Sequence, residues 1–122
     1  MKPANASIDG GNSPPEKPVP PPSKIGNKVV FSPPLAVGDA PKRKGEIVDE
    51  VWTEIYPDKA WGWYIYTSQL IKWADGSRSI RMTYYYHPEG GARWIFGGQY
   101  SLEDTPDVIH GLIRDTLVKN WK

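Results

Sequence analysis

Flat aromatic side chains and basic side chains alternate along the middle of this sequence. Fourteen of the fifteen aromatic residues lie between Trp52 and Trp121, and most of them fall in the bursts 61–66, 84–86 and 94–96. Aromatic rings can stack on unpaired bases, at about 1–3 kcal/mol per base, while Lys and Arg neutralise neighbouring phosphates. These residue types therefore predict non-covalent binding of a single-stranded nucleic acid, either DNA or RNA.

The ionisable residues form no recognisable catalytic pattern. His87 lies in an expected turn and His110 on an expected helix, and the acidic run 46–58 is typical of a solvated strand edge. No phosphate-binding glycine loop, metal-ligand spacing or nucleophile motif appears, and the chain has no cysteine. We therefore expect a protein that is not an enzyme and that uses no cofactor or metal.

Four strands and one helix are expected to position the aromatic residues. Apolar residues and turn signals predict strands over residues 46–56, 61–73, 78–86 and 93–101. A single apolar stripe (Val108, Ile109, Leu112, Ile113, Leu117) predicts a helix over 106–121, with Thr105 or Asp104 as its cap and Pro106 at its first position. The expected fold is α+β, a four-stranded antiparallel β-sheet followed by one C-terminal amphipathic helix.

The turn between the second and third strands decides which side chains share a face. Asp75-Gly76 is typical of a two-residue type I′ turn, which would pair Ala74 with Ser77 and Tyr66 with Tyr85. The face away from the helix would then hold the candidate nucleic-acid-binding residues Tyr64, Tyr66, Lys72, Arg81, Tyr85, Trp94 and Phe96. A one-residue slip would exchange the two faces, so this prediction depends on the turn type.

The loop after the third expected strand and the glycines of the fourth expected strand affect the same face. A six-residue loop over 87–92 would pair Tyr85 with Trp94 and place Thr83 opposite Phe96. Gly97-Gly98 within the fourth strand indicates a bulge, a bend or the close approach of another part of the backbone.

Residues 1–44 differ in composition from the rest of the chain. They contain ten of the thirteen prolines, few large apolar residues and a net charge of +4. Such a segment buries too little surface to offset its ordering entropy, so we expect a disordered, Pro-rich basic tail. Within it, residues 29–37 could form a short extended piece against the edge of the domain.

Residues 45–122 form the expected domain, and their small number suggests a partner. A domain of 78 residues is often marginally stable alone, which favours a homodimer. No apolar run approaches the roughly 20 residues of a membrane span, so no membrane partner is expected. Since the N-terminus carries no hydrophobic signal region, we expect a cytoplasmic location.

The order of expected elements resembles the single-stranded DNA-binding fold of the Positive Cofactor Four coactivators and the plant Whirly proteins. The resemblance covers about residues 71–117: Asp75-Gly76, Ile80-Arg81 leading into 84–86, then 88–90, and Gly98 before Ser101-Leu102 and the helix. It implies a homodimer whose sheet binds single strands, with Lys72 and Arg81 on phosphates and Tyr66, Tyr85 and Trp94 on bases.

A second hypothesis comes from the charge of residues 45–122, which is −3. Phosphate neutralisation usually dominates nucleic-acid affinity, whereas an acidic domain with a second aromatic layer also suits contact with protein. The alternative function is thus a protein-interaction or assembly module whose aromatic face is a dimer or partner interface.

Overall fold

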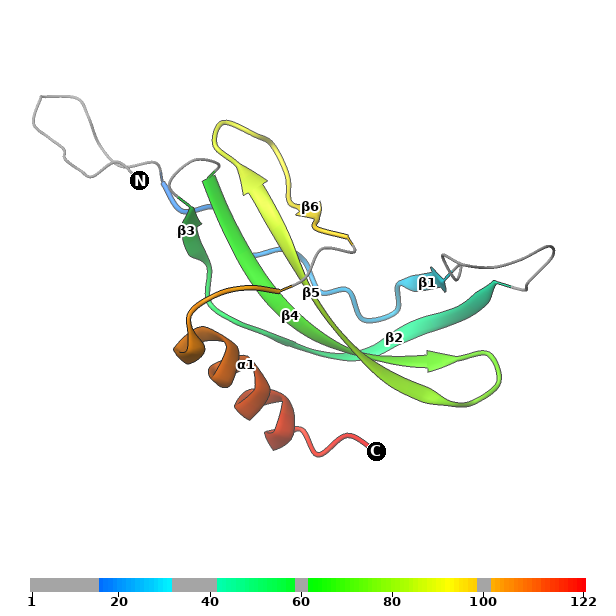
Figure 1. Cartoon of the computed structure of the whole chain (residues 1–122). Helices are drawn as coiled ribbons and strands as arrows, with labels where there is room; N and C mark the ends of the chain where they lie inside the picture. The colour runs from blue at the N-terminus through cyan, green and yellow to red at the C-terminus, as the bar shows by residue number, and fades with distance from the viewer. Residues whose placement is uncertain (1–15, 32–41, 59–61, 99–101) are drawn as a thin grey trace, which may run out of the picture.

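A computed structural model (Figure 1) describes residues 16–31, 42–58, 62–98 and 102–122. The strands of these ranges are β1 (Lys28–Phe31), β2 (Arg43–Trp52), β3 (Tyr56–Asp58), β4 (Gly62–Trp73), β5 (Arg78–Pro88) and β6 (Ile95–Phe96), and the helix is α1 (Pro106–Val118). The prediction of an α+β fold with an antiparallel sheet and a C-terminal helix is confirmed. The predicted number of strands is wrong, because the described residues form six rather than four.

The strands form one curled sheet in the order β1-β2-β4-β5-β6, and β3 also pairs with β4 (Figure 1). Residues 16–31 belong to this fold, although their composition predicts a disordered tail. The short edge piece expected over 29–37 exists in part as β1, which pairs with the start of β2 through Val29↔Gly45 and Val30↔Lys44. Residues 1–15 and 32–41 lie outside the described ranges.

A β-bulge at Val48 interrupts the alternation of β2. Ile47 pairs with Ile71, but Asp49 already pairs with Leu70, so Val48 is an extra residue. The bulge moves every later side chain of β2 to the other face relative to a regular strand. The regular strand expected over residues 46–56 is therefore interrupted at Val48.

The hairpin between β4 and β5 has a three-residue turn instead of the expected two-residue turn. The backbone N–H of Trp73 donates to the Ser77 carbonyl at 2.8 Å, and Gly76 has the positive φ of +89° that ends such a turn. The Asp75 carboxylate accepts from the Ser77 N–H at 2.9 Å and from its hydroxyl at 2.6 Å. This side chain stabilises the longer turn, and the pairing shifts by one residue.

The shift exchanges the partners along the whole hairpin. Tyr66 pairs with Tyr84 rather than Tyr85, and Ile65 pairs with Tyr85. The helix face, which α1 covers in part, therefore carries the even-numbered residues of β4 and β5. The opposite face, which we call the N-terminal face because residues 16–31 lie against it, carries the odd-numbered ones. Ile65 and Ile71 therefore lie on the N-terminal face, away from the helix.

The two faces have separate cores. On the N-terminal face, Val29, Ile47, Ile71 and Trp73 form a buried cluster. On the helix face, Leu112 of α1 is 1% exposed and is the deepest apolar contact of the helix. The division follows from Figure 1, in which α1 lies on one side of the sheet near β2 and β4.

The helix begins where its sequence predicts and ends slightly earlier. Thr105 is the N-cap, its side chain accepts from the Val108 N–H, and Pro106 opens the first turn. The predicted apolar stripe is only partly used, because Ile113 is 40% and Leu117 is 73% exposed. Within the described ranges, no helix has both the length and the apolar character to cross a membrane.

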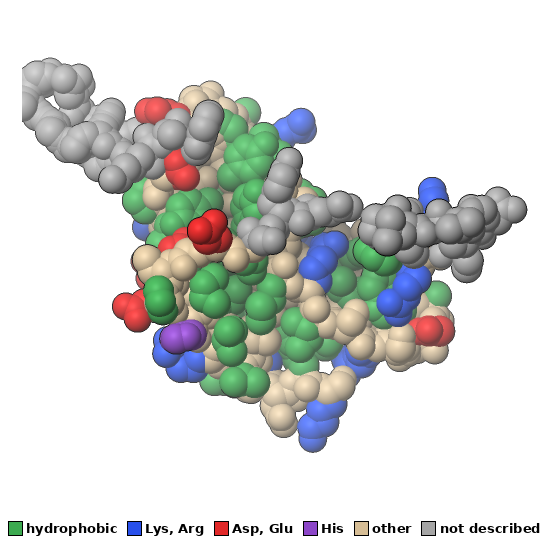
Figure 2. All heavy atoms as spheres, in the orientation of Figure 1, with side chains coloured by type: hydrophobic (Ala, Val, Ile, Leu, Met, Phe, Trp, Pro, Cys, Tyr) green, Lys and Arg blue, Asp and Glu red, His purple; other side chains and the backbone are tan. Residues whose placement is uncertain are grey.

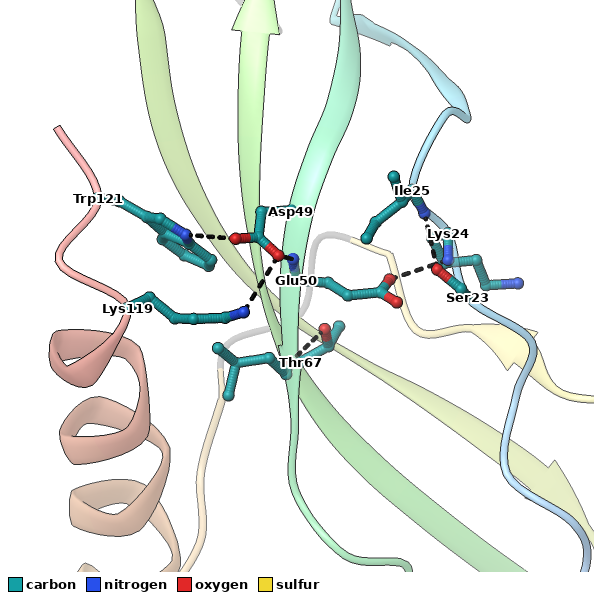
Figure 3. A network of polar contacts seen from close by, with 9 residues as sticks. Ser23, Lys24, Ile25, Asp49, Glu50, Thr67, Lys119 and Trp121 are labelled. Carbon is teal, nitrogen blue, oxygen red and sulfur yellow. Dashed lines mark hydrogen bonds and ion pairs between the residues drawn. The ribbon is translucent and has the colours of Figure 1, made fainter.

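Two neighbouring acids of β2 hold the C-terminal residues and residue 24 of the N-terminal segment (Figure 3). Asp49 accepts from the Trp121 indole at 2.9 Å and pairs with the Lys119 ammonium at 3.3 Å. Glu50 points the other way and accepts from the backbone N–H of Lys24 at 2.8 Å. The acidic run of β2 is thus structural, and it holds α1 and the N-terminal segment on their respective faces.

Candidate nucleic-acid interface

The observed pairing gathers three predicted binding residues, Arg81, Tyr85 and Phe96, on the N-terminal face. The ring of Tyr85 lies between two others, with centroids 5.6 Å from Trp52 and 5.4 Å from Phe96. Tyr85 pairs with Phe96 instead of Trp94, a shift of two residues that keeps the side chains on the expected common face. We call Trp52, Tyr85 and Phe96 the aromatic cluster.

The members of the aromatic cluster differ in exposure. Tyr85 is only 7% exposed, whereas Phe96 is 44% exposed. Residues 16–31 pass over this face and contribute to the difference. Phe96 is therefore the ring that a base can reach, and Tyr85 supports it from behind.

Cationic groups lie directly over rings of the N-terminal face. The guanidinium carbon of Arg81 is 5.1 Å from the centre of the Phe96 ring, the Lys24 ammonium is 5.0 Å from that of Tyr85, and the guanidinium carbon of Arg43 is 4.2 Å from that of Trp73. At these distances the cations are attracted to the ring faces. The N-terminal face thus interleaves rings and positive charges, as the sequence suggests, but with a partly different membership.

Arg81 is held in place by Gln69, its cross-strand partner. Its Nε and Nη2 donate to the Gln69 Oε1 at 3.0 and 2.8 Å. Burial lowers the pKa of the Arg81 guanidinium, which nevertheless stays charged at neutral pH. The guanidinium has five N–H groups, so three more can donate to an incoming acceptor.

Gln69 is itself unusual in this setting. It is fully buried, and its Nε2 has no hydrogen-bond partner among the described residues. A buried donor without a partner destabilises the fold. The region around Arg81 therefore has donor capacity that the described side chains do not satisfy.

Trp94, another predicted binding residue, holds the N-terminal segment. Its indole N–H donates to the Val19 carbonyl at 2.8 Å, and its ring packs edge-on against His87 with centroids 5.3 Å apart. Trp94 is half-buried. This hydrogen bond joins Trp94, which follows β5, to a residue 75 positions earlier in the chain.

The remaining three predicted residues, Tyr64, Tyr66 and Lys72, lie on the helix face. The prediction that all seven binding residues share one surface is therefore wrong. The cause is the one-residue shift of the hairpin. Lys72 is exposed and lies opposite Glu46 of β2 and Arg78 of β5. It cannot act together with Arg81 on one side of the sheet.

Tyr64 and Tyr66 bind the segment that precedes the helix. Both hydroxyls donate to Asp104 Oδ2 at 2.9 Å, and the single hydroxyl hydrogen of Tyr66 is shared with the Glu103 carbonyl, whose oxygen is 3.1 Å away. Burial, reinforced by the contact with Asp104, raises the pKa of both tyrosines. These rings therefore position α1, and Tyr66 is only 5% exposed.

The carboxylate of Asp104 is ionised in this arrangement. Burial alone would raise its pKa, but the Thr105 N–H and the hydroxyls of Tyr64 and Tyr66 donate to it and bring the pKa below its ordinary value. The sequence identifies Asp104 only as an alternative helix cap. Its role as the common acceptor of two distant tyrosines has no local sequence signal.

Sequence reasoning also missed Trp52 and Lys24. Trp52 reaches the N-terminal face because of the bulge at Val48, which no residue type announces. Lys24 lies in a segment that its composition assigns to a tail, and its position depends on the hydrogen bond to Glu50. Both positions result from long-range contacts.

The two histidines lie at the end of β5 and on the surface of α1. His87 Nδ1 lies 3.0 Å from the Pro88 carbonyl, and His110 is exposed on α1. Among the described residues, no group of three or more His, Cys, Asp or Glu side chains could hold a metal ion. Comparisons of the chain with protein-family models, with curated proteins and with solved structures found no match.

Proposed function

We propose that this chain is a non-catalytic protein that binds single-stranded nucleic acid on the N-terminal face of its sheet. The observation that carries the proposal is the set of three cation–ring pairs on that face: Lys24 with Tyr85, Arg43 with Trp73, and Arg81 with Phe96. Rings that stack on bases and cations that contact phosphates are the parts that a sequence-tolerant single-strand site requires. Phe96 would supply the stacking ring, whereas Trp73 and Tyr85 are buried and their pairs would contribute the cations Arg43 and Lys24.

The three pairs follow the long axis of the β4–β5 hairpin. Trp73 lies at the turn of the hairpin, where it is bonded to Ser77 across the turn. Tyr85 lies near the far end of the hairpin, eight positions after Ser77 along β5. At about 3.4 Å per residue, this distance is about 27 Å. A short single strand could contact the cations of all three pairs in turn.

Within this surface, Phe96 and Arg81 form the most accessible point. Phe96 is 44% exposed, and the guanidinium beside it has donors left for a phosphate. A base on Phe96 would place its phosphate near the Arg81 guanidinium, which is 5.1 Å from the centre of that ring. The site therefore differs from the predicted set: it uses Arg81 and Phe96, adds Lys24, Arg43 and Trp52, and assigns Tyr64 and Tyr66 to the fold.

Titration of a labelled single-stranded oligonucleotide at two salt concentrations tests the proposal. Phe96→Ala should weaken binding by about 1–3 kcal/mol, or about 5- to 150-fold, because it removes a stacking platform. Arg81→Gln and Lys24→Gln should each lower the salt dependence by about 0.7 in the slope of log affinity against log salt.

Ile95→Ala is the matched control for Phe96→Ala. Ile95 is the neighbour of Phe96 in β6 and is 37% exposed, but its side chain is on the helix face. It should leave the affinity unchanged. Absence of binding at low salt, or equal losses in the two variants, would refute the proposal.

A second function, assembly as a homodimer, is favoured by exposed apolar residues on the helix face. Ile80 and Met82 of β5 are 49% and 39% exposed, and Ile113 and Leu117 of α1 are 40% and 73% exposed. Figure 2 shows hydrophobic side chains gathered over the helix and the adjacent sheet. A second copy presenting the same surface would cover them, and this contact would not involve the N-terminal face.

Analytical ultracentrifugation tests the assembly directly. Leu117→Lys combined with Met82→Lys should convert a dimer into a monomer, because a buried unpaired charge opposes association. Val19→Lys is the control, since Val19 is 78% exposed and belongs to the segment on the other face. A wild-type protein that sediments as a monomer at high concentration would exclude the homodimer.

A further inference from the structure

An open groove on the helix face combines aromatic walls with an acidic rim. Its volume is about 540 Å³. Its described lining consists of aromatic rings, a proline and carboxylates: Asp58, Trp63, Tyr64, Tyr66, Tyr84, Tyr86, Pro88, Glu103 and Asp104. We call it the acidic groove, and it lies on the opposite side of the sheet from the proposed nucleic-acid surface.

The walls of the acidic groove are fixed in position. The Tyr64 and Tyr66 rings meet edge-on at 5.5 Å, and both hydroxyls are tied to Asp104. Tyr84 is backed by Gly97, where a Cβ would come within 2.4 Å of the ring. Tyr86, at 36% exposure, offers its ring to a ligand. These contacts hold the groove open before any ligand arrives.

The negative charge of the residues that line the groove favours a cationic ligand. Glu103 is exposed at the rim, and Asp104 is ionised although it already accepts three hydrogen bonds. A carboxylate has about four acceptor positions, so Asp104 can accept one more. No Lys or Arg lines the groove in the part of the chain that the structure describes. Phosphates would be repelled here, whereas a cation would be attracted to both carboxylates and ring faces.

We propose that the acidic groove binds an arginine side chain of a partner polypeptide. A guanidinium stacks its flat face on an aromatic ring and donates from its edge to carboxylates, so it uses both kinds of wall at once. The volume of the groove exceeds that of one side chain and leaves room for the flanking backbone of a peptide. The site shares no lining residue with the proposed nucleic-acid surface.

The test uses a labelled peptide with one arginine between glycines, followed by fluorescence anisotropy with the full chain. The same peptide with citrulline, which keeps the shape and removes the charge, should bind at least about fivefold more weakly. Glu103→Gln combined with Tyr86→Leu should cause a similar loss, since it removes one rim charge and one ring. Both positions are exposed, so the fold should persist, which circular dichroism verifies.

Glu89→Gln is the matched control, because Glu89 is an exposed acid of the turn after β5 that does not line the groove. It should leave peptide affinity within about twofold, and the groove variant should bind the oligonucleotide like wild type. Equal binding of the citrulline peptide, or an unaffected groove variant, would overturn the proposal. So would a dimer that occupies the groove and that the peptide does not displace.

Discussion

Asp49 and Glu50 are adjacent in β2, yet they anchor the two ends of the described chain to opposite faces of the sheet. Asp49 holds Trp121 and Lys119 on the helix face, while Glu50 holds the backbone of Lys24 on the N-terminal face. Their opposite directions follow from strand alternation, and the bulge at Val48 sets which acid meets which segment. The sequence suggests that these two acids are solvated. In the fold they instead hold the segments that cover the two faces of the sheet.

Substitution of these acids should loosen different segments. Asp49→Ala should destabilise the protein by about 1–2 kcal/mol through loss of a charge-assisted hydrogen bond, and hydrogen exchange should increase in residues 112–122. Glu50→Ala should instead raise exchange in residues 16–31. If both variants loosened the same segment, the assignment of one acid to each face would be wrong.

The turn of the β4–β5 hairpin should depend on a glycine. Gly76 has a φ of +89° with open space around it, so Gly76→Ala should cost about 1–2 kcal/mol from backbone strain alone. Gly76→Asn should cost less, because asparagine tolerates positive φ better. Chemical denaturation measures both, and equal stability of the alanine variant and wild type would contradict the observed turn.

The tyrosine contacts with Asp104 should stabilise the attachment of the helix. Tyr66→Phe removes the donor to Asp104 and to the Glu103 carbonyl and should cost about 1.5–3 kcal/mol. Tyr86→Phe, at a 36% exposed position of the same face, should change the unfolding free energy by less than about 0.5 kcal/mol. A comparison of the two urea midpoints decides whether the hydroxyl of Tyr66 matters.

Stability should fall in acid because four carboxylates of the described residues have lowered pKa values in the fold: Glu46, Asp49, Asp75 and Asp104. The Trp121 indole N–H is the main cause for Asp49, while for Asp104 the hydrogen bonds from Thr105, Tyr64 and Tyr66 outweigh burial. A group whose folded pKa is depressed contributes stability above its ordinary pKa of 3.8. This stability is lost as the pH falls through 3.8 towards the folded value.

Urea midpoints measured between about pH 5 and about pH 3 should therefore decrease, and Asp49→Asn with Asp104→Asn should decrease less steeply. Asp75 also has a lowered pKa, mainly from the Ser77 hydroxyl, so the double variant should keep part of the slope. An unchanged slope in the double variant would show that these two carboxylates do not respond to folding.

The parts of the fold that the sequence predicts correctly depend on local chemistry. Thr105 and Pro106 define the start of α1, and Asp75-Gly76 marks the hairpin. The register within that hairpin escapes prediction because the Asp75 side chain, bonded to Ser77, selects a three-residue turn over a two-residue one. A difference of one residue in the turn was enough to divide the predicted site between two faces.

The composition of the candidate site depends on contacts that no local pattern contains. Lys24 reaches Tyr85 because its backbone is bonded to Glu50, 26 positions away, and Trp94 bonds to Val19. Proline content predicts a disordered tail and gives no indication of where this segment lies. The prediction of rings among cations still stands as a description of the N-terminal face, with Lys24, Arg43 and Trp52 in place of Tyr64, Tyr66 and Lys72.

Residue-level mapping of a photo-crosslinked oligonucleotide tests the central claim most directly. A single strand carrying 5-iodouracil, bound at low salt and irradiated, should crosslink to Phe96, Trp94 or Trp52 on the N-terminal face, as mass spectrometry of the digested complex would show. Crosslinks confined to the helix face, at Tyr84, Tyr86 or α1, would contradict the account, as would an absence of crosslinks under conditions in which a single-strand-binding control protein reacts.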